Sequence, residues 1–179
     1  TIIDKFQLGY CLNQRDAFIQ YAIKNGYSKE LLLKIGLASG NEERMYDKYQ
    51  GRVIFPIHNL TGKVIGFGAR ILSGDKTKAK YLNSPESEIY NKSQTLYGIY
   101  FAKNEISRLD ECILVEGYAD VLSMHQAGIE NTVASSGTSL TTEQIRLISR
   151  YTKNITILYD GDNAGIHAAL RGTDMILEE

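Results

Sequence analysis

The second half of the chain alternates between short runs of apolar residues and longer segments in which apolar residues recur every three or four positions. The short runs are rich in β-branched and aliphatic residues and end close to a glycine or an acidic residue, which is typical of buried strands. Strands that alternate with helices across short connections predict a parallel sheet with right-handed crossovers. We expect strands over 112–115, 131–134 and 155–159, and helices near 101–108, over about 119–126, after a cap at Thr141 or Thr142, and from about 164.

The first half has a mixed pattern. Residues 2–11 have the composition of a strand, and residues 15–25 have apolar positions in helical spacing. Ser28 is a good N-cap for a second short helix. Two apolar runs, 52–57 and 64–71, predict a β-hairpin with glycine at its turn, and a basic polar loop follows at 73–80.

These patterns together predict an α/β fold in two parts. The first part, residues 1–97, is an α+β subdomain that contains the basic hairpin. The second part, residues 98–179, is a parallel β-sheet flanked by helices.

Composition narrows the class of protein. The chain has 179 residues, of which 43% are hydrophobic, and no apolar run approaches the ~20 residues of a membrane helix. We therefore expect a soluble, intracellular protein without a membrane partner. Cys11 and Cys112 lie far apart, which argues against disulfides and a zinc site within this chain, and the three histidines lack ligand spacing. Because the chain begins with Thr1, we expect it to be an excised fragment.

Charge is distributed unevenly along the chain. Residues 51–104 contain eight Lys or Arg against three Asp or Glu, whereas residues 110–179 contain four against eleven. A basic part beside an acidic part suits a polyanion held against a metal centre. Taken alone, such a bias is more often a solvated charged surface.

Acidic residues follow two of the expected parallel strands. Glu116 comes directly after the first, with Asp120 one helical turn later, and Asp160 and Asp162 flank Gly161 after the third. Carboxyl ends of parallel strands meet at one edge of a sheet, and open α/β sheets carry their chemistry there.

Crowded carboxylates repel one another unless cations lie between them, and Mg²⁺ binds through oxygen ligands. The alternatives are a helix-terminal charge for Asp120 and a turn with an N-cap for Asp160 and Asp162. We favour a metal-dependent site that acts on phosphates.

The order of motifs resembles the DnaG-type bacterial DNA primases over nearly all of the chain. The acidic segments and the strand between them are similar to the Toprim domain of this family, and the upstream segments to the N-terminal subdomain of its catalytic core. The matching segments are 51–57, 64–70, 80–86, 96–98, 116–120, 134–138 and 159–165.

The resemblance implies a function and a set of site residues. It implies synthesis of short RNA primers on single-stranded DNA, by nucleotidyl transfer that depends on Mg²⁺ or Mn²⁺. The implied catalytic residues are Glu116, Asp160 and Asp162; the implied metal ligands are these three and Asp120; the implied nucleotide and template contacts are Arg52, Arg70, Lys80 and Lys92. The implied partners are the DNA template, ribonucleoside triphosphates and, through a C-terminal domain, the replicative helicase. The implied location is the replication fork in the bacterial cytoplasm, as part of the primosome.

This chain also departs from the family pattern. The family has a third acidic strand end, an N-terminal zinc ribbon and the helicase-docking domain, and none of these occurs between Thr1 and Glu179. We therefore expect the fragment itself to be weakly active or inactive.

Three other interpretations remain open from the sequence. A phosphatase with an aspartyl nucleophile would normally have threonine after the acidic pair, where this chain has Asn163 and Ala164. Another Toprim protein, such as a topoisomerase or a nuclease, would leave the motifs at 51–86 unexplained. A fragment that only binds nucleotide or single-stranded DNA is the third.

Overall fold

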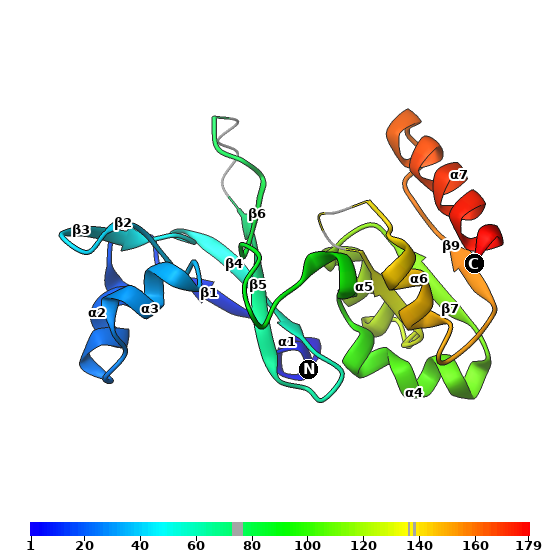
Figure 1. Ribbon diagram of the computed structural model, residues 1–179, viewed down its shortest axis with the longest axis horizontal. Coiled ribbons are helices and arrows are strands. Elements are labelled where there is room, and N and C mark those ends of the chain that lie inside the picture. Colours follow the sequence, from blue (N-terminus) through cyan, green and yellow to red (C-terminus); the bar gives the residue numbers. More distant parts are fainter. Residues whose placement is uncertain (73–76, 136, 138) are drawn as a thin grey trace. The chain divides into compact units, whose positions relative to one another are not determined.

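The computed structural model describes residues 1–72, 77–135, 137 and 139–179, and the chain forms two compact units. The first unit comprises Thr1, Ile3–Pro56 and Gly66–Tyr90, and the second comprises Ile2, Ile57–Ile65 and Asn91–Glu179 (Figure 1). Part of the expected basic loop, 73–76, and two positions of the 134–138 motif, 136 and 138, lie outside the described residues. Within the described part of the chain, no helix is both long and apolar enough to cross a membrane.

An antiparallel sheet organises the first unit. Its strands, in the spatial order β1-β4-β5-β6, are β1 (Gly9–Cys11), β4 (Arg52–His58), β5 (Val64–Ile71) and β6 (Tyr81–Asn83). The hairpin expected at 52–57 and 64–71 is confirmed. Its turn, at the tip that belongs to the second unit, is closed by Asn59, whose side-chain oxygen accepts hydrogen bonds from the backbone N–H groups of Thr61 and Lys63 at 3.0 Å each.

The strand expected over residues 2–11 is wrong. Helix α1 (Ile2–Phe6) occupies the first part, and only Gly9–Cys11 are extended. Thr1 and Asp4 form a capping box, which satisfies N–H groups that would otherwise lack partners at the start of the helix. Helical spacing also buries Phe6 completely, so that the composition of the segment was a poor guide to its conformation.

A small helical layer completes the first unit. It consists of α2 (Ala17–Lys24), α3 (Lys29–Lys34) and a hairpin of β2 (Ala38–Asn41) and β3 (Arg44–Asp47). The Ser28 cap is confirmed, since its side chain accepts a hydrogen bond from the Leu31 N–H. The hairpin was not expected, because its residues are mostly polar. Its last residue, Asp47, is buried and accepts hydrogen bonds from the N–H groups of Phe18 and Ile19, which caps α2 from a distant part of the chain.

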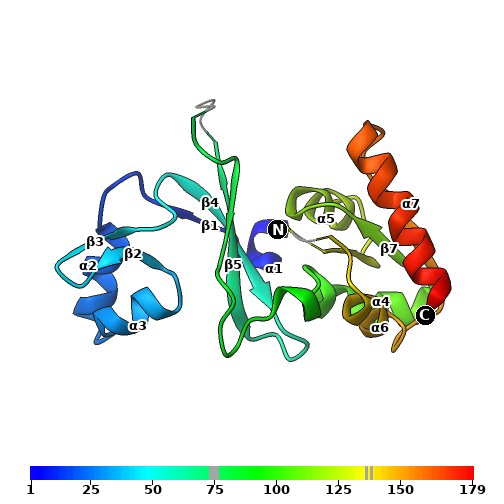
Figure 2. The same cartoon turned by 45° about the horizontal axis from the view of Figure 1, so that its top comes forward.

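The second unit contains the expected parallel sheet. Its strands run in the order β8-β7-β9, and both pairs are parallel. The elements are η1 (Lys92–Gln94), α4 (Ile99–Leu109), β7 (Cys112–Val115), α5 (Tyr118–Gln126), β8 (Thr132–Ala134), α6 (Thr142–Ile148), β9 (Ile155–Ile157) and α7 (Asn163–Glu178) (Figure 2).

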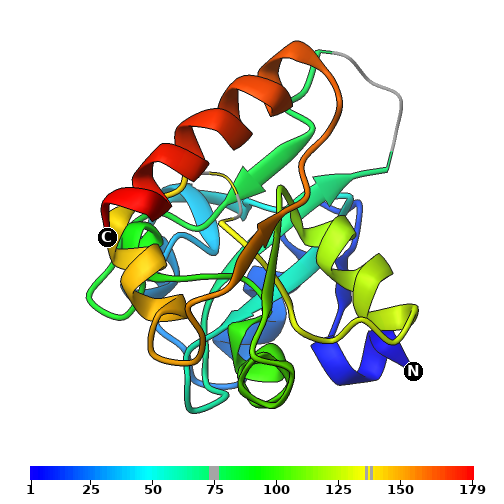
Figure 3. The ribbon, with the colours of Figure 1, turned by 90° about the vertical axis from the view of Figure 1, so that its right-hand side faces the viewer.

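Helices flank this sheet and bury it. The core is formed by apolar residues of α4, β7, β8 and α6, among them Ile106, Leu114, Val133 and Ile148, all fully buried. Helix α7 packs against β9 and α6 (Figure 3). The α/β fold class is therefore confirmed, and the carboxyl ends of the strands lie beside the segments that carry the acidic residues.

Candidate functional site

The carboxyl ends of β7 and β9 bring two of the expected acidic segments together. Leu114 lies opposite Ile157 in the parallel register, and the Leu158 N–H donates to the Leu114 carbonyl, so the two chains leave the sheet side by side. Beyond this point the Asp160 N–H donates to Oε1 of Glu116 at 2.9 Å. The Glu116 carboxylate therefore fixes the backbone of the Asp160–Asp162 segment directly.

The first turn of α7 packs on this contact without any space. A Cβ atom at Gly165 would lie 2.2 Å from the Asp160 carbonyl oxygen and 2.8 Å from Oε1 of Glu116. Both distances are shorter than contacts that a real Cβ atom makes. Glycine at this position therefore allows α7 to begin against the acidic segment.

The other two acidic residues cap helices. Oδ2 of Asp120 accepts a hydrogen bond from the Gly117 N–H at 2.9 Å, and Oδ1 of Asp162 accepts one from the Gly165 N–H at 2.8 Å. Each carboxylate thus neutralises part of the positive end of a helix dipole. The capping roles weighed as alternatives from the sequence are both present.

The four carboxylates do not form a ready-made cage. Across 1–72, 77–135, 137 and 139–179, no group of three or more His, Cys, Asp or Glu side chains is arranged to hold a metal ion. The expectation that all four crowd one rim is therefore not met by the side chains, although their segments are adjacent. Carboxylates repel one another, and the N–H groups at the two helix N-termini offer them separate partners.

A pocket of about 400 Å³ opens beside Glu116, between the strand ends and α7. Tyr159 lines it, and burial together with the negative charge of Glu116 raises the pKa of the Tyr159 phenol to about 12. The phenol is therefore a neutral hydrogen-bond donor at physiological pH. Arg171 lines the same pocket and was not among the expected site residues. Helical spacing was the available signal, because Ala168, Arg171 and Met175 share one face of α7.

Basic side chains of the first unit gather around one tyrosine. The Arg70 guanidinium and the Lys80 ammonium lie 5.8 and 6.0 Å from the centre of the Tyr81 ring, within the range of cation–π attraction. Arg52 has a different environment. It is buried, and its guanidinium donates a hydrogen bond to the Lys80 carbonyl at 3.3 Å. Burial also lowers the pKa of Arg52.

Lys92 belongs to the second unit, where a buried glutamine holds its backbone. The Gln144 side chain is fully buried and donates hydrogen bonds to the carbonyls of Lys92 at 3.0 Å and Thr95 at 2.8 Å. Thr141, the N-cap of α6, donates to the Ser93 carbonyl. Sequence reasoning expected the cap but missed this connection, because residues 92–95 and 141–144 become neighbours only in the folded unit.

Comparison with protein families agrees with this arrangement. Residues 1–103 match the model of the DNA primase catalytic core, N-terminal domain, and residues 113–179 match the Toprim-like model. The DNA primase of Clostridium acetobutylicum is 46% identical over 175 residues, which are 97% of this chain and 29% of that protein. The DNA primase of Deinococcus radiodurans is 42% identical and is covered to 31% by 98% of this chain. The chain thus spans about 30% of the length of these relatives.

Solved structures agree as well. The Aquifex aeolicus primase, with its zinc-binding and RNA polymerase domains, matches with a TM-score of 0.90 at 39% identity, over 98% of this chain and 43% of that one. The Escherichia coli primase catalytic core matches with a TM-score of 0.86 at 39% identity, over 97% and 55%. A DnaG primase catalytic domain bound to single-stranded DNA matches with the same score and identity, over 97% and 56%. The chain therefore belongs to the DnaG-type DNA primase family and corresponds to part of its catalytic core.

Proposed function

We propose that this chain is the part of a primase catalytic core that joins ribonucleotides on a single-stranded DNA template. Family membership supports the activity, and the contact between Glu116 and the Asp160 backbone supports the location of the site. The contact places a carboxylate from each of two neighbouring parallel strands at one sheet edge, where open α/β sheets carry their chemistry. We also keep residues 1–97 and 98–179 as the proposed domains.

The donor chemistry of this edge fits a hard divalent cation. Glu116, Asp160, Asp162 and Asp120 supply only carboxylate oxygens, the ligands that Mg²⁺ and Mn²⁺ prefer. When bound, such ions lower the pKa of a primer 3′-hydroxyl and stabilise charge on the triphosphate. Glu116 holds the Asp160 backbone through Oε1, and we assign its other oxygen to the metal or to the hydroxyl proton. Asp160 and Asp162 are the remaining catalytic residues of the proposal.

The basic residues are proposed to hold nucleotide and template. Arg70, Lys80 and Lys92 carry positive charge on or beside described strands and turns, and phosphates are the natural partners of such groups. Arg52 is assigned a positioning role, since it is buried and holds the Lys80 carbonyl. The DNA-bound relative supports single-stranded DNA as the template. Ribonucleoside triphosphates as substrates, a replicative helicase as a partner of the whole protein and the replication fork as its location also belong to the proposal.

Ribonucleotide incorporation by the full-length protein on single-stranded DNA tests this function. Glu116→Gln keeps the hydrogen bond to Asp160 but removes the charge, and we expect synthesis to fall by about 10²–10³ while template affinity is retained. Glu111→Gln is a matched control, because Glu111 lies just before β7 and accepts a hydrogen bond from Thr156.

Two outcomes would contradict the proposal. Near-normal synthesis by Glu116→Gln would remove the catalytic role from Glu116. Template binding without any incorporation, at every Mg²⁺ or Mn²⁺ concentration, would leave a protein that only binds nucleic acid.

A further inference from the structure

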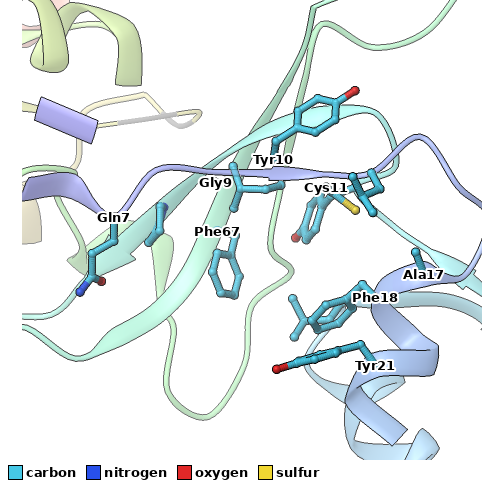
Figure 4. A pocket seen from close by; sticks show the side chains of 13 residues that line it. Gln7, Gly9, Tyr10, Cys11, Ala17, Phe18, Tyr21 and Phe67 are labelled. Carbon is cyan, nitrogen blue, oxygen red and sulfur yellow. The ribbon is translucent and has the colours of Figure 1, made fainter. Parts of the chain in front are cut away.

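The first unit contains an apolar pocket of about 560 Å³ for which the proposed reaction has no use. It is lined by thirteen residues, none of which is Asp, Glu, Lys or Arg. Strand β1 forms one rim, α2 carries Phe18 and Tyr21 at another, and Phe67 points in from β5 (Figure 4). The tyrosines that seemed scattered in the sequence are thus partly gathered, since Tyr10, Tyr21 and Tyr49 all line this pocket.

Several lining side chains are both large and exposed. Tyr10 is 52% exposed, Leu12 54% and Tyr21 67%. Single exposed apolar residues are common on protein surfaces, but a contiguous group around a hollow marks an interaction site. The exposure also shows that the pocket is an open groove, which suits a segment of polypeptide better than a fully enclosed small molecule.

The strand at the rim has a free side. β1 is the first strand in the order β1-β4-β5-β6, and among the described strands it pairs only with β4. An exposed edge strand is a template for one further strand, and the backbone pairing supplies affinity while side-chain pockets supply specificity. Here the apolar pocket lies directly beside such an edge.

Charge decides between nucleic acid and protein as the occupant. Nucleic-acid binding draws its affinity from Lys and Arg contacts with phosphates, and the pocket lining contains neither. We propose that the groove binds an extended, uncharged segment of a partner protein, which pairs with β1 and inserts an aromatic or long aliphatic side chain into the pocket. This inference does not depend on the proposed catalytic function.

Gly9 offers a way to block the groove without disturbing the fold. It lies opposite Ile54 in the β1–β4 pair and lines the pocket. A Cβ atom at Gly9 would meet only the Ile54 Cβ, at 3.9 Å, and Gly9 is not among the glycines with positive φ. Gly9→Leu therefore projects a side chain into the groove without backbone strain, and strands favour such a residue over glycine.

A tryptophan-containing peptide provides the binding probe. The chain has no tryptophan, so the emission of acetyl-Ser-Thr-Trp-Thr-Val-Thr-Ser-amide reports burial of the peptide alone. We expect a blue shift on titration with the full 179-residue chain, and affinity weakened at least about tenfold by Gly9→Leu and by Tyr21→Ser. Tyr27→Ser is the matched control, because Tyr27 is also exposed but does not line the pocket. A peptide with proline in place of both outer threonines should bind poorly, since it lacks backbone donors.

Circular dichroism checks that each variant is folded, and the exposed Tyr21 and Tyr27 pair keeps the test valid if Gly9→Leu does not fold. The proposal is overturned by any of four results: no binding of the peptide up to millimolar concentration, equal affinity of all variants, equal affinity of the proline peptide, or displacement of the peptide by oligothymidylate.

Discussion

Gly165 is the position where one methyl group tests the geometry of the candidate site. Alanine inside a helix is normally more favourable than glycine by about 0.5–1 kcal/mol. At Gly165, however, the new Cβ would lie 2.2 Å from the Asp160 carbonyl oxygen and 2.8 Å from Oε1 of Glu116. The first of these contacts is with backbone, so α7 or the 160–162 segment has to move.

The structure sets the size of the effect. Overpacking of this kind costs about 1–3 kcal/mol, and the helix preference of alanine offsets part of it. We expect Gly165→Ala to lower the free energy of unfolding by about 1–2 kcal/mol, which corresponds to about 2–8 °C in Tm for a chain of this size. The displaced segment also breaks the hydrogen bond between the Asp160 N–H and Glu116, so we expect weaker Mn²⁺ binding.

Thermal unfolding with and without Mn²⁺ measures both effects. Gly172→Ala is the control on the same helix, since its Cβ would meet only the ends of the Ile157 and Leu140 side chains, at 3.2 and 3.5 Å. Gly161→Ala adds a methyl group where nothing lies within 4 Å. If Gly165→Ala raises Tm as much as Gly172→Ala does, the close packing of α7 on the acidic segment is refuted.

Three further predictions concern the second unit. Mn²⁺ should raise Tm by mass action, and Asp160→Asn with Asp162→Asn should abolish the rise without unfolding the chain, because asparagine also caps helices; an unchanged rise in a calorimetric titration would argue against these ligands. Gln144→Leu leaves the Lys92 carbonyl without its donor, so stability should fall by about 1–3 kcal/mol in urea unfolding and the salt dependence of nucleotide binding should change; wild-type behaviour in both would reject the positioning role. The raised pKa of Tyr159, about 12 against about 10 when unfolded, means that the native state holds this proton more tightly, so stability should fall between pH 10 and 12, and Tyr159→Phe should flatten that fall in denaturation curves.

Local patterns determined much of the second unit from the sequence. The strand at 112–115 and the helix ending at Gln126 have the expected bounds to within a residue, because buried strands and amphipathic helices have distinct periods. β9 is shorter than expected and ends at Ile157, although Leu158 still pairs with β7. The adjacency of Glu116 and Asp160 also followed from the sequence, since parallel strands end at one edge.

Conformations that depend on distant partners could not be determined this way. The first residues form α1 because Thr1 and Asp4 cap it and Phe6 is buried, and β1 is a strand because β4 pairs with it. The polar hairpin of β2 and β3 has no apolar alternation, and its Asp47 is recognisable as a cap only once α2 is beside it.

By itself, the sequence determined which residues can carry charge at the sheet edge and in the basic hairpin, because strand period and chain order are local properties. The tertiary structure alone decided how each side chain is used. Asp120 and Asp162 bond to helix N-termini, Arg52 is buried against the Lys80 carbonyl, and Gln144 holds Lys92 across some fifty residues. A hydrogen bond requires its donor and acceptor within about 3 Å, and for partners far apart in the chain only the packing of whole elements brings them to that distance.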